Sequence, residues 1–293
     1  MIADMLDTNV NDARLRPAST GAATMDILLI NLDRSPDRLA FMAAQLDRLG
    51  LAFTRLPAVD GATIADEEFN RLSPTYMRPL SRAELGCLFS HMSAWAFCAE
   101  TNRPALILED DAFLSDRLPA FLSELERKGP RNIINLETRG AGKWVSAKPL
   151  PWPTHCGVSL YSLYIDRGGA AGYVMWPEAA RKLLERSRNY AAPADAFIDL
   201  SGVARFQAEP ALVSPLYQAK DENRRVAPAF TSTNPKPSRV FRHSLILRPR
   251  FKARRLAGYI SMTARKIGTI GVGVRRRIDI CSTICARADN WRS

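Results

Sequence analysis

The sequence predicts an α/β fold with a ligand site at the carboxyl edge of its buried strands. Residues 25–59 have the pattern of a strand, a helix and a second strand, a β-α-β unit whose crossover should be right-handed. The apolar run Ala105–Leu108 is bounded by Pro104 and by three acids, as in a short strand buried on both faces. The chain has 293 residues, 46% hydrophobic and 24% charged, so it can bury a substantial globular core.

Positive charge is concentrated at the carboxyl end of the chain. The net charge is +11, and residues 236–293 hold 15 of the 41 Lys and Arg side chains but only two of the 30 acids. Prolines at 235 and 237 mark a linker before this segment. We therefore expect a disordered leader over residues 1–24, a globular domain over residues 25–234 and a basic amphipathic extension over residues 235–293.

Cysteine usage and hydropathy favour the cytoplasm. The five cysteines are an odd number without the double pair typical of zinc sites, which favours reduced thiols. The sequence has neither a run of about 20 apolar residues, as a membrane span needs, nor an apolar signal core near Met1.

The first β-α-β unit carries clear boundary signals. Met25–Leu32 is the first expected strand, Ser35 suits the helix N-cap and Pro36 the first helical position. Gly50 should end the helix, and Phe53–Val59 should be the second strand. Backbone N–H groups at this helix start, with Arg34 and Arg38, could receive a phosphate. The alternative is that both arginines are solvated surface residues.

A long helix should begin at Ser81, which has capping-box spacing to Glu84. His91 lies on this helix and is interpreted as either a structural or a catalytic residue. The helix leads into the strand that ends at Glu109–Asp111. Three adjacent carboxylates repel one another, so they could hold Mg²⁺ or Mn²⁺, or could simply form a solvated helix cap.

The second half of the domain has weaker signals. The pattern of Asn132–Glu137 predicts another strand that ends in an acid, and the composition of Gly140–Lys148 predicts a mobile loop. Small residues at Gly168–Gly172 allow close approach of either a ligand or neighbouring backbone. Asp195 and Asp199 are spaced to share one helical face.

Several of these motifs also follow one another in a recognisable order. The close matches are Ile30–Arg38, Pro57–Gly61, Leu80–Trp95 and Leu106–Ala112, and the looser ones are Gly169–Val174 and Pro193–Phe197. Together they resemble glycosyltransferase family 25, the bacterial lipopolysaccharide glycosyltransferases that include β-galactosyltransferases and relatives of collagen galactosyltransferase. The resemblance covers about residues 25–220.

The resemblance implies a GT-A fold, a nucleotide-diphosphate sugar donor and a divalent metal. It places Asp111 and Glu109 as metal ligands, and Asp110 toward the donor ribose or the metal. It also places Arg34 and Arg38 at the nucleotide. Asp195 falls in a Pro-Val-Asp-like motif that serves the acceptor or reaction centre, although Ala194 replaces the usual Val.

The predicted function is therefore metal-dependent, inverting hexose transfer with Mn²⁺ or Mg²⁺. Galactose from a UDP-sugar is the expected donor group, and lipopolysaccharide or another envelope glycan is the expected acceptor. Asp195 would act as general base. Residues 239–293 should hold the enzyme at the inner face of the cytoplasmic membrane through basic and apolar side chains.

Two alternatives remain open at this point. The first is a non-catalytic protein whose basic tail binds nucleic acid or another polyanion, although the sequence has no specific nucleic-acid motif. The second is a metal-dependent phosphoryl transferase, which would also use acids at a strand end.

Overall fold

The computed structural model describes residues 25–128, 132–152, 155–166, 168–215 and 248–284. The expected leader, the linker and residues 285–293 of the expected extension lie outside these residues. The described helices are α2 (Pro36–Arg48), α3 (Asp66–Leu72), α4 (Arg82–Thr101), α5 (Leu118–Lys128), α6 (Pro177–Ser187), α7 (Ala194–Asp199) and α9 (Arg248–Ile267). Short 3-10 turns span Gly61–Thr63 and Ser73–Thr75.

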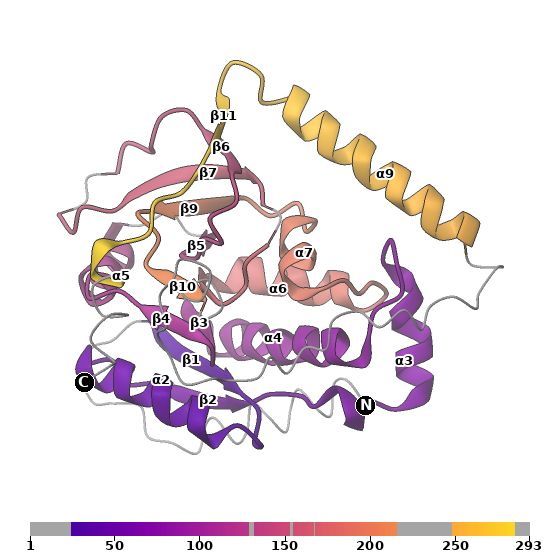
Figure 1. Cartoon of the computed structure of the whole chain (residues 1–293), viewed down its shortest axis with the longest axis horizontal. Helices are drawn as coiled ribbons and strands as arrows, with labels where there is room; N and C mark the ends of the chain where they lie inside the picture. Colours follow the sequence, from indigo (N-terminus) through magenta and orange to yellow (C-terminus); the bar gives the residue numbers. More distant parts are fainter. Residues whose placement is uncertain (1–24, 129–131, 153–154, 167, 216–247, 285–293) are drawn as a thin grey trace.

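A mixed sheet forms the centre of the molecule (Figure 1). Its strands are β1 (Asp26–Asn31), β2 (Thr54–Pro57), β3 (Ala105–Glu109), β5 (Ile133–Asn135), β6 (Lys143–Ser146), β7 (Ser159–Ile165), β8 (Gly172–Met175), β9 (Arg205–Glu209) and β11 (Gly273–Arg276). Their order is β11-β6-β7-β9-β5-β8-β3-β1-β2. β4 (Ala112–Leu114) and β10 (Val213–Pro215) pair separately. The fold is thus mixed α/β, as the sequence predicts.

The predicted β-α-β unit is confirmed, because β1 pairs in parallel with both β2 and β3. α2 begins at Pro36 after Ser35, as expected. The capping box of α4 is also present: Ser81 Oγ accepts the Glu84 N–H, and Glu84 Oε2 accepts the Ser81 N–H. The parallel pairing of β1 with β3 places the carboxyl ends of these two strands beside each other.

Alternate residues of the central strands pack into two layers. Ala105 and Ile107 of β3 belong to a core that includes α4 and α6 residues, whereas Leu106 and Leu108 pack with residues of α2 and α5. All four are fully buried, as predicted for a strand covered on both faces. The rigid ends of β1 and β3 therefore hold the acidic residues that follow them.

The expectation of a mobile loop over Gly140–Lys148 was wrong, because Lys143–Ser146 forms β6. The Lys143 ammonium group is buried and donates to Glu137 O, Asp166 Oδ2 and Gln207 Oε1 at 2.7–2.9 Å. A buried charge requires such partners. They come from distant parts of the sequence, so the local composition could not reveal them.

The last described residues return to the domain. β11 pairs with β6, and the side chains of Ile278, Cys281 and Ile284 are buried in the core. The α9 helix before them lies along one side of the molecule (Figure 1). None of the helices described in the structure is long and apolar enough to cross a bilayer.

Candidate functional site

A pocket of about 410 Å³ opens at the carboxyl ends of β1 and β3, beside α4. All five residues predicted for the donor and metal line it: Arg34, Arg38, Glu109, Asp110 and Asp111. Asp195 does not line this pocket and borders a second one beside α9. The structure thus brings together the two amino-terminal arginines and the acidic triplet, which are about 75 residues apart in the sequence.

Asp110 is the centre of a buried polar cluster. Its Oδ1 accepts from Arg38 Nη1 at 2.8 Å, and its Oδ2 accepts from Asn31 Nδ2 at 2.7 Å. Burial raises the pKa of Asp110, while Arg38 and Asn31 oppose that rise. Because both carboxylate oxygens have partners, Asp110 serves to fix Arg38 and Asn31 at the pocket wall.

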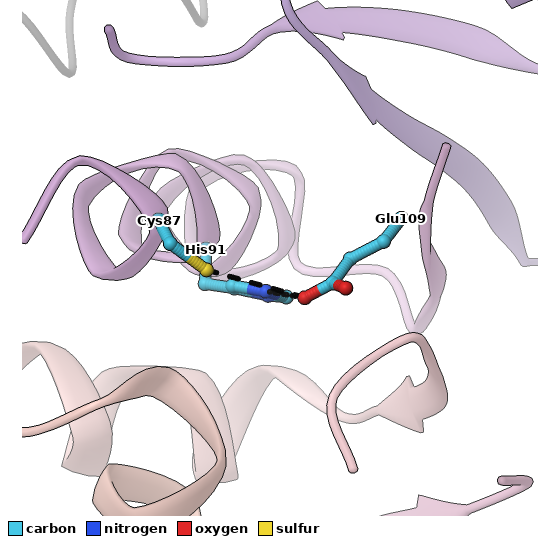
Figure 2. A group of neighbouring side chains, drawn as sticks. All are labelled: Cys87, His91 and Glu109. Atoms are coloured by element: carbon cyan, nitrogen blue, oxygen red, sulfur yellow. Dashed lines mark hydrogen bonds and ion pairs between the residues drawn. The ribbon is translucent and has the colours of Figure 1, made fainter. Parts of the chain in front are cut away.

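Glu109 is oriented by a chain of aromatic and imidazole groups. His91 Nε2 lies 3.0 Å from Glu109 Oε1, and His91 Nδ1 lies 2.9 Å from the Tyr173 hydroxyl. That hydroxyl also accepts from Trp95 Nε1 at 2.8 Å. Tyr173 can therefore donate to Nδ1, which leaves Nε2–H to donate to Glu109. Figure 2 shows His91 and Cys87 reaching from α4 toward Glu109.

The pKa values of the acidic triplet differ according to their partners. Burial disfavours the charged form of Glu109, but the His91 hydrogen bond and nearby arginines outweigh burial and lower its pKa. Burial and the neighbouring charge of Glu109 raise the pKa of Asp111 to about 7. The buried Oδ1 of Asp111 has no hydrogen-bond partner within the described ranges. An anionic oxygen in this position fits a bound cation.

Two ligand sets could hold a cation here, and both contain Glu109. Ligand atoms of Cys87, His91 and Glu109 lie within 4.8 Å of one another. However, both ring nitrogens of His91 already make hydrogen bonds, and a thiol is a soft ligand. Glu109 with Asp111 offers the hard oxygen atoms that Mg²⁺ or Mn²⁺ prefers, so the residues present fit the predicted metal.

The opposite wall of the pocket depends on close packing of α4 against the Asp60–Gly61 turn. A Cβ on Gly86 would lie 2.7 Å from Val59 O, and a Cβ on Gly61 would lie 2.2 Å from Arg82 O. Both positions therefore require glycine. This contact places Asp60 where its carboxylate pairs with Arg34. Arg34, one of the two arginines predicted to bind the nucleotide, is thus held by a residue of a tightly packed turn.

Asp195 lies near the same centre but does not line the pocket of the acidic triplet. An ideal Cβ on Gly168 would be 3.5 Å from Asp195 Oδ2 and 3.3 Å from Arg139 Nη1, and Arg139 Nε donates to buried Glu137. Burial raises the pKa of Asp195, the Ala196 N–H and Arg139 lower it, and Glu109 adds to the rise. A carboxylate with a raised pKa in a pocket is suited to proton transfer.

Sequence reasoning left Asn31, Cys87 and Tyr173 without a functional assignment and left the role of His91 open. Asn31 is the last residue of β1 and Glu109 is the last residue of β3. This shared position at a strand end is the sequence feature that could have placed Asn31 in the site. Cys87 and His91 are four apart on α4, which places them on one face. No sequence pattern indicates a role for Tyr173, because its contact with His91 joins β8 to α4 across the core.

The fold and the strand-edge pocket together define an α/β protein in which arginine and carboxylate side chains gather beside the first β-α-β unit. The profile of glycosyltransferase family 25 (LPS biosynthesis protein) matches residues 24–198, more than half of the chain. The protein belongs to this family, as the sequence motifs indicate.

Relatives with known names span animals and bacteria. A glycosyltransferase 25 family member of Anopheles gambiae is 28% identical over 59% of this chain and 31% of its own length. Procollagen galactosyltransferase 1-B of Xenopus laevis is 30% identical over 54% of this chain and 28% of its own length. Lacto-N-neotetraose biosynthesis glycosyltransferase LgtB of Neisseria meningitidis serogroup B is 27% identical over 74% of this chain and 90% of its own length. The chain thus spans about a third of the length of these animal relatives.

Proposed function

We propose that the protein is a hexosyltransferase that uses a nucleotide-diphosphate sugar, with galactose from UDP-galactose as the first candidate. The observation that carries the proposal is the convergence of Arg34, Arg38 and the acidic triplet in one pocket of a family 25 protein. The names of the galactosyltransferase and LgtB relatives support a hexose. A saccharide of lipopolysaccharide or another envelope glycan is the proposed acceptor.

Some of the site residues act on the sugar donor, and Asp195 acts on the acceptor. Arg34 and Arg38 supply guanidinium donors to the donor diphosphate, and Asp110 keeps Arg38 in place. The His91–Tyr173 pair orients the Glu109 carboxylate. Asp195 accepts the proton of the attacking acceptor hydroxyl, since such a hydroxyl needs a carboxylate base within hydrogen-bond reach. A single displacement of this kind inverts the anomeric carbon.

Glu109 and Asp111 would hold the divalent cation, proposed as Mn²⁺ or Mg²⁺. When bound, a divalent cation supplies Lewis-acid stabilisation of the charge that develops on the leaving nucleotide diphosphate. Asp111 would contribute its Oδ1, which has no hydrogen-bond partner among the described residues, and Glu109 would contribute a carboxylate that His91 already orients. The fold of the first β-α-β unit and the adjoining acids would be of the GT-A kind.

The donor is tested by incubating the purified full chain with UDP-, GDP- and CMP-sugars and Mn²⁺, and measuring release of the free nucleotide. We expect release from a UDP-hexose above that from the other donors. Absence of release and of binding with every donor would defeat the enzymatic proposal. Transfer of phosphate to the acceptor would instead favour a phosphoryl transferase.

We also propose that α9 contacts an anionic membrane surface on the cytoplasmic side. Leu256, Ile260 and Ile267 recur at helical spacing and are each at least 60% exposed. Gly258, Met262 and Arg265, which line a pocket against the domain, lie on the opposite face of the helix. The outer face is therefore an apolar stripe within a strongly basic helix, the pattern of an interfacial helix.

Replacing Leu256, Ile260 and Ile267 together by Ser should weaken binding to anionic phospholipid vesicles by about 100-fold. Each substitution gives up about 1 kcal/mol of apolar burial, and about 1.4 kcal/mol corresponds to tenfold. Vesicle sedimentation measures the change, and Ala264→Ser on the same helix serves as the control. Point substitutions are preferable to deleting the tail, because Ile278 and Cys281 belong to the core. Equal vesicle binding by the triple variant and the parent would contradict membrane contact through α9.

A further inference from the structure

A second pocket, of about 440 Å³, lies between α7 and α9. α7 contributes Asp195, Ala196 and Asp199, and α9 contributes Met262 and Arg265 among others. Pockets of this size commonly bind small ligands. Asp195 lies on its wall, so a ligand here would be next to the proposed base and outside the pocket of the acidic triplet.

The α9 wall is fixed to the domain by directed contacts. Arg265 donates to Asp199 Oδ2 at 2.9 Å, to Asp199 O at 3.1 Å and to Tyr164 O at 3.3 Å. At the other end of the pocket, Arg255 Nε donates to Met77 O at 3.2 Å. One wall of the pocket is therefore a stretch of α9 that is tied to the domain at two positions.

The charges around the pocket are mostly neutralised. Asp199 accepts from Arg265 and from Arg205, and Asp166 accepts from Lys143 at 2.8 Å. Asp195 is left with a hydrogen bond from the Ala196 N–H. Arg255, whose guanidinium donates to Met77 O, adds one positive charge to the lining and offsets the charge of Asp195. A pocket whose charges offset one another in this way favours an uncharged ligand that carries hydroxyl groups.

The remaining lining groups suit the two surfaces of a sugar ring. Tyr76, Tyr259 and the methionines Met77 and Met262 offer apolar faces for C–H groups. Burial raises the pKa of Tyr76 to about 12, so its hydroxyl stays a neutral donor and acceptor at physiological pH. Carboxylate, guanidinium and phenol groups can bind the ring hydroxyls.

We infer that this pocket binds the terminal sugar of an uncharged saccharide acceptor and that the inner face of α9 selects it. The inference rests on the proposed transferase function, which it deepens by naming the acceptor class and its site. Residues 248–267 lie outside the segment that matches the family, so acceptor choice is a property of this chain's own carboxyl-terminal part.

The test uses the full chain with UDP and Mn²⁺ present and three neutral probes: methyl β-galactopyranoside, methyl β-glucopyranoside and methyl N-acetyl-β-glucosaminide. Methyl β-glucuronide is the charged comparison. Saturation-transfer NMR should detect binding of at least one neutral probe, and weaker binding of the glucuronide. Met262→Trp fills the pocket and should weaken the neutral probe at least tenfold. Ala264→Trp, exposed on the same helix, should leave it unchanged.

Gly258→Leu is a second filling variant, because an added Cβ there already lies 3.3 Å from Met77 Cε. Thermal unfolding checks that each variant folds. Calorimetry with UDP on the same samples measures nucleotide binding at the pocket of the acidic triplet separately. If UDP binds but no neutral probe does, or if both filling variants bind the probe like the parent, the acceptor pocket is refuted while the proposed function stands. If probes bind and UDP does not, the proposed function fails and the saccharide pocket stands.

Discussion

Asp195→Asn should reduce turnover with acceptor by about 10²–10⁴-fold, the usual contribution of a positioned general base. The amide keeps the volume and the hydrogen bond from the Ala196 N–H but cannot take up the acceptor proton. Donor affinity should stay within about twofold, since Asp195 does not line the donor pocket. Steady-state kinetics and UDP calorimetry measure the two effects. Glu178→Gln, an exposed acid at the start of α6, is the matched control.

The same variant should change the pH profile. Burial raises the pKa of Asp195, Arg139 and the Ala196 N–H oppose that rise, and Glu109 and Asp166 add to it. Because the base must be ionised, the turnover of the parent should fall on the acid side at a pH above about 3.9, the ordinary Asp value. At saturating Mn²⁺, which keeps the Asp111 carboxylate ionised, the residual activity of Asp195→Asn should lack this limb. An unchanged acid limb in the variant would assign the titration to another group.

Asp195→Asn should also make the fold slightly more stable at neutral pH. A carboxyl whose pKa is raised by folding disfavours the folded state once it is ionised, above its unfolded pKa. The amide removes this cost, so the gain over the parent should disappear as the pH falls below about 3.9. A gain in stability combined with a loss of turnover distinguishes a functional carboxylate from a structural one.

Asp111→Asn should lower metal-supported turnover by about 10³-fold, which corresponds to about 4 kcal/mol of charge stabilisation. The substitution keeps the side-chain volume and removes the charge of the orphaned oxygen. Mn²⁺ calorimetry on the same protein should show weakened binding, and this readout is independent of turnover. Asp47→Asn, an exposed change on α2, should alter neither quantity. The structure already excludes a helix cap, because β4 follows the triplet directly, so parental Mn²⁺ affinity in Asp111→Asn would contradict metal binding by Asp111.

The predictable part of the fold was the part governed by local rules. The Ser81–Glu84 box, the Pro36 helix start and the apolar run before Glu109 each depend on neighbouring residues, and each is present as expected. The position of the acidic triplet followed from that strand, because strand ends converge at one edge of a sheet. Arg38 meets Asp110 because α2 follows β1, and β1 pairs in parallel with β3.

The parts that sequence reasoning missed depend on distant contacts. Lys143 can be buried because Asp166 neutralises its charge and Gln207 accepts a hydrogen bond from it. The strand that contains Lys143 therefore depends on residues far away in the sequence. β8 runs antiparallel between β3 and β5, which no local pattern signals. The α9 wall of the second pocket depends on Arg265 meeting Asp199 across 66 positions.

The most direct test of the central claim is mass spectrometry of a saccharide acceptor after incubation with the full chain, a UDP-hexose and Mn²⁺. The account predicts that the acceptor gains one hexose residue while UDP is released, and that the gain is strongly reduced in Asp111→Asn and Asp195→Asn. An acceptor that gains phosphate, or that stays unchanged while the parent protein binds the donor and the metal, would contradict the assignment of this site to sugar transfer.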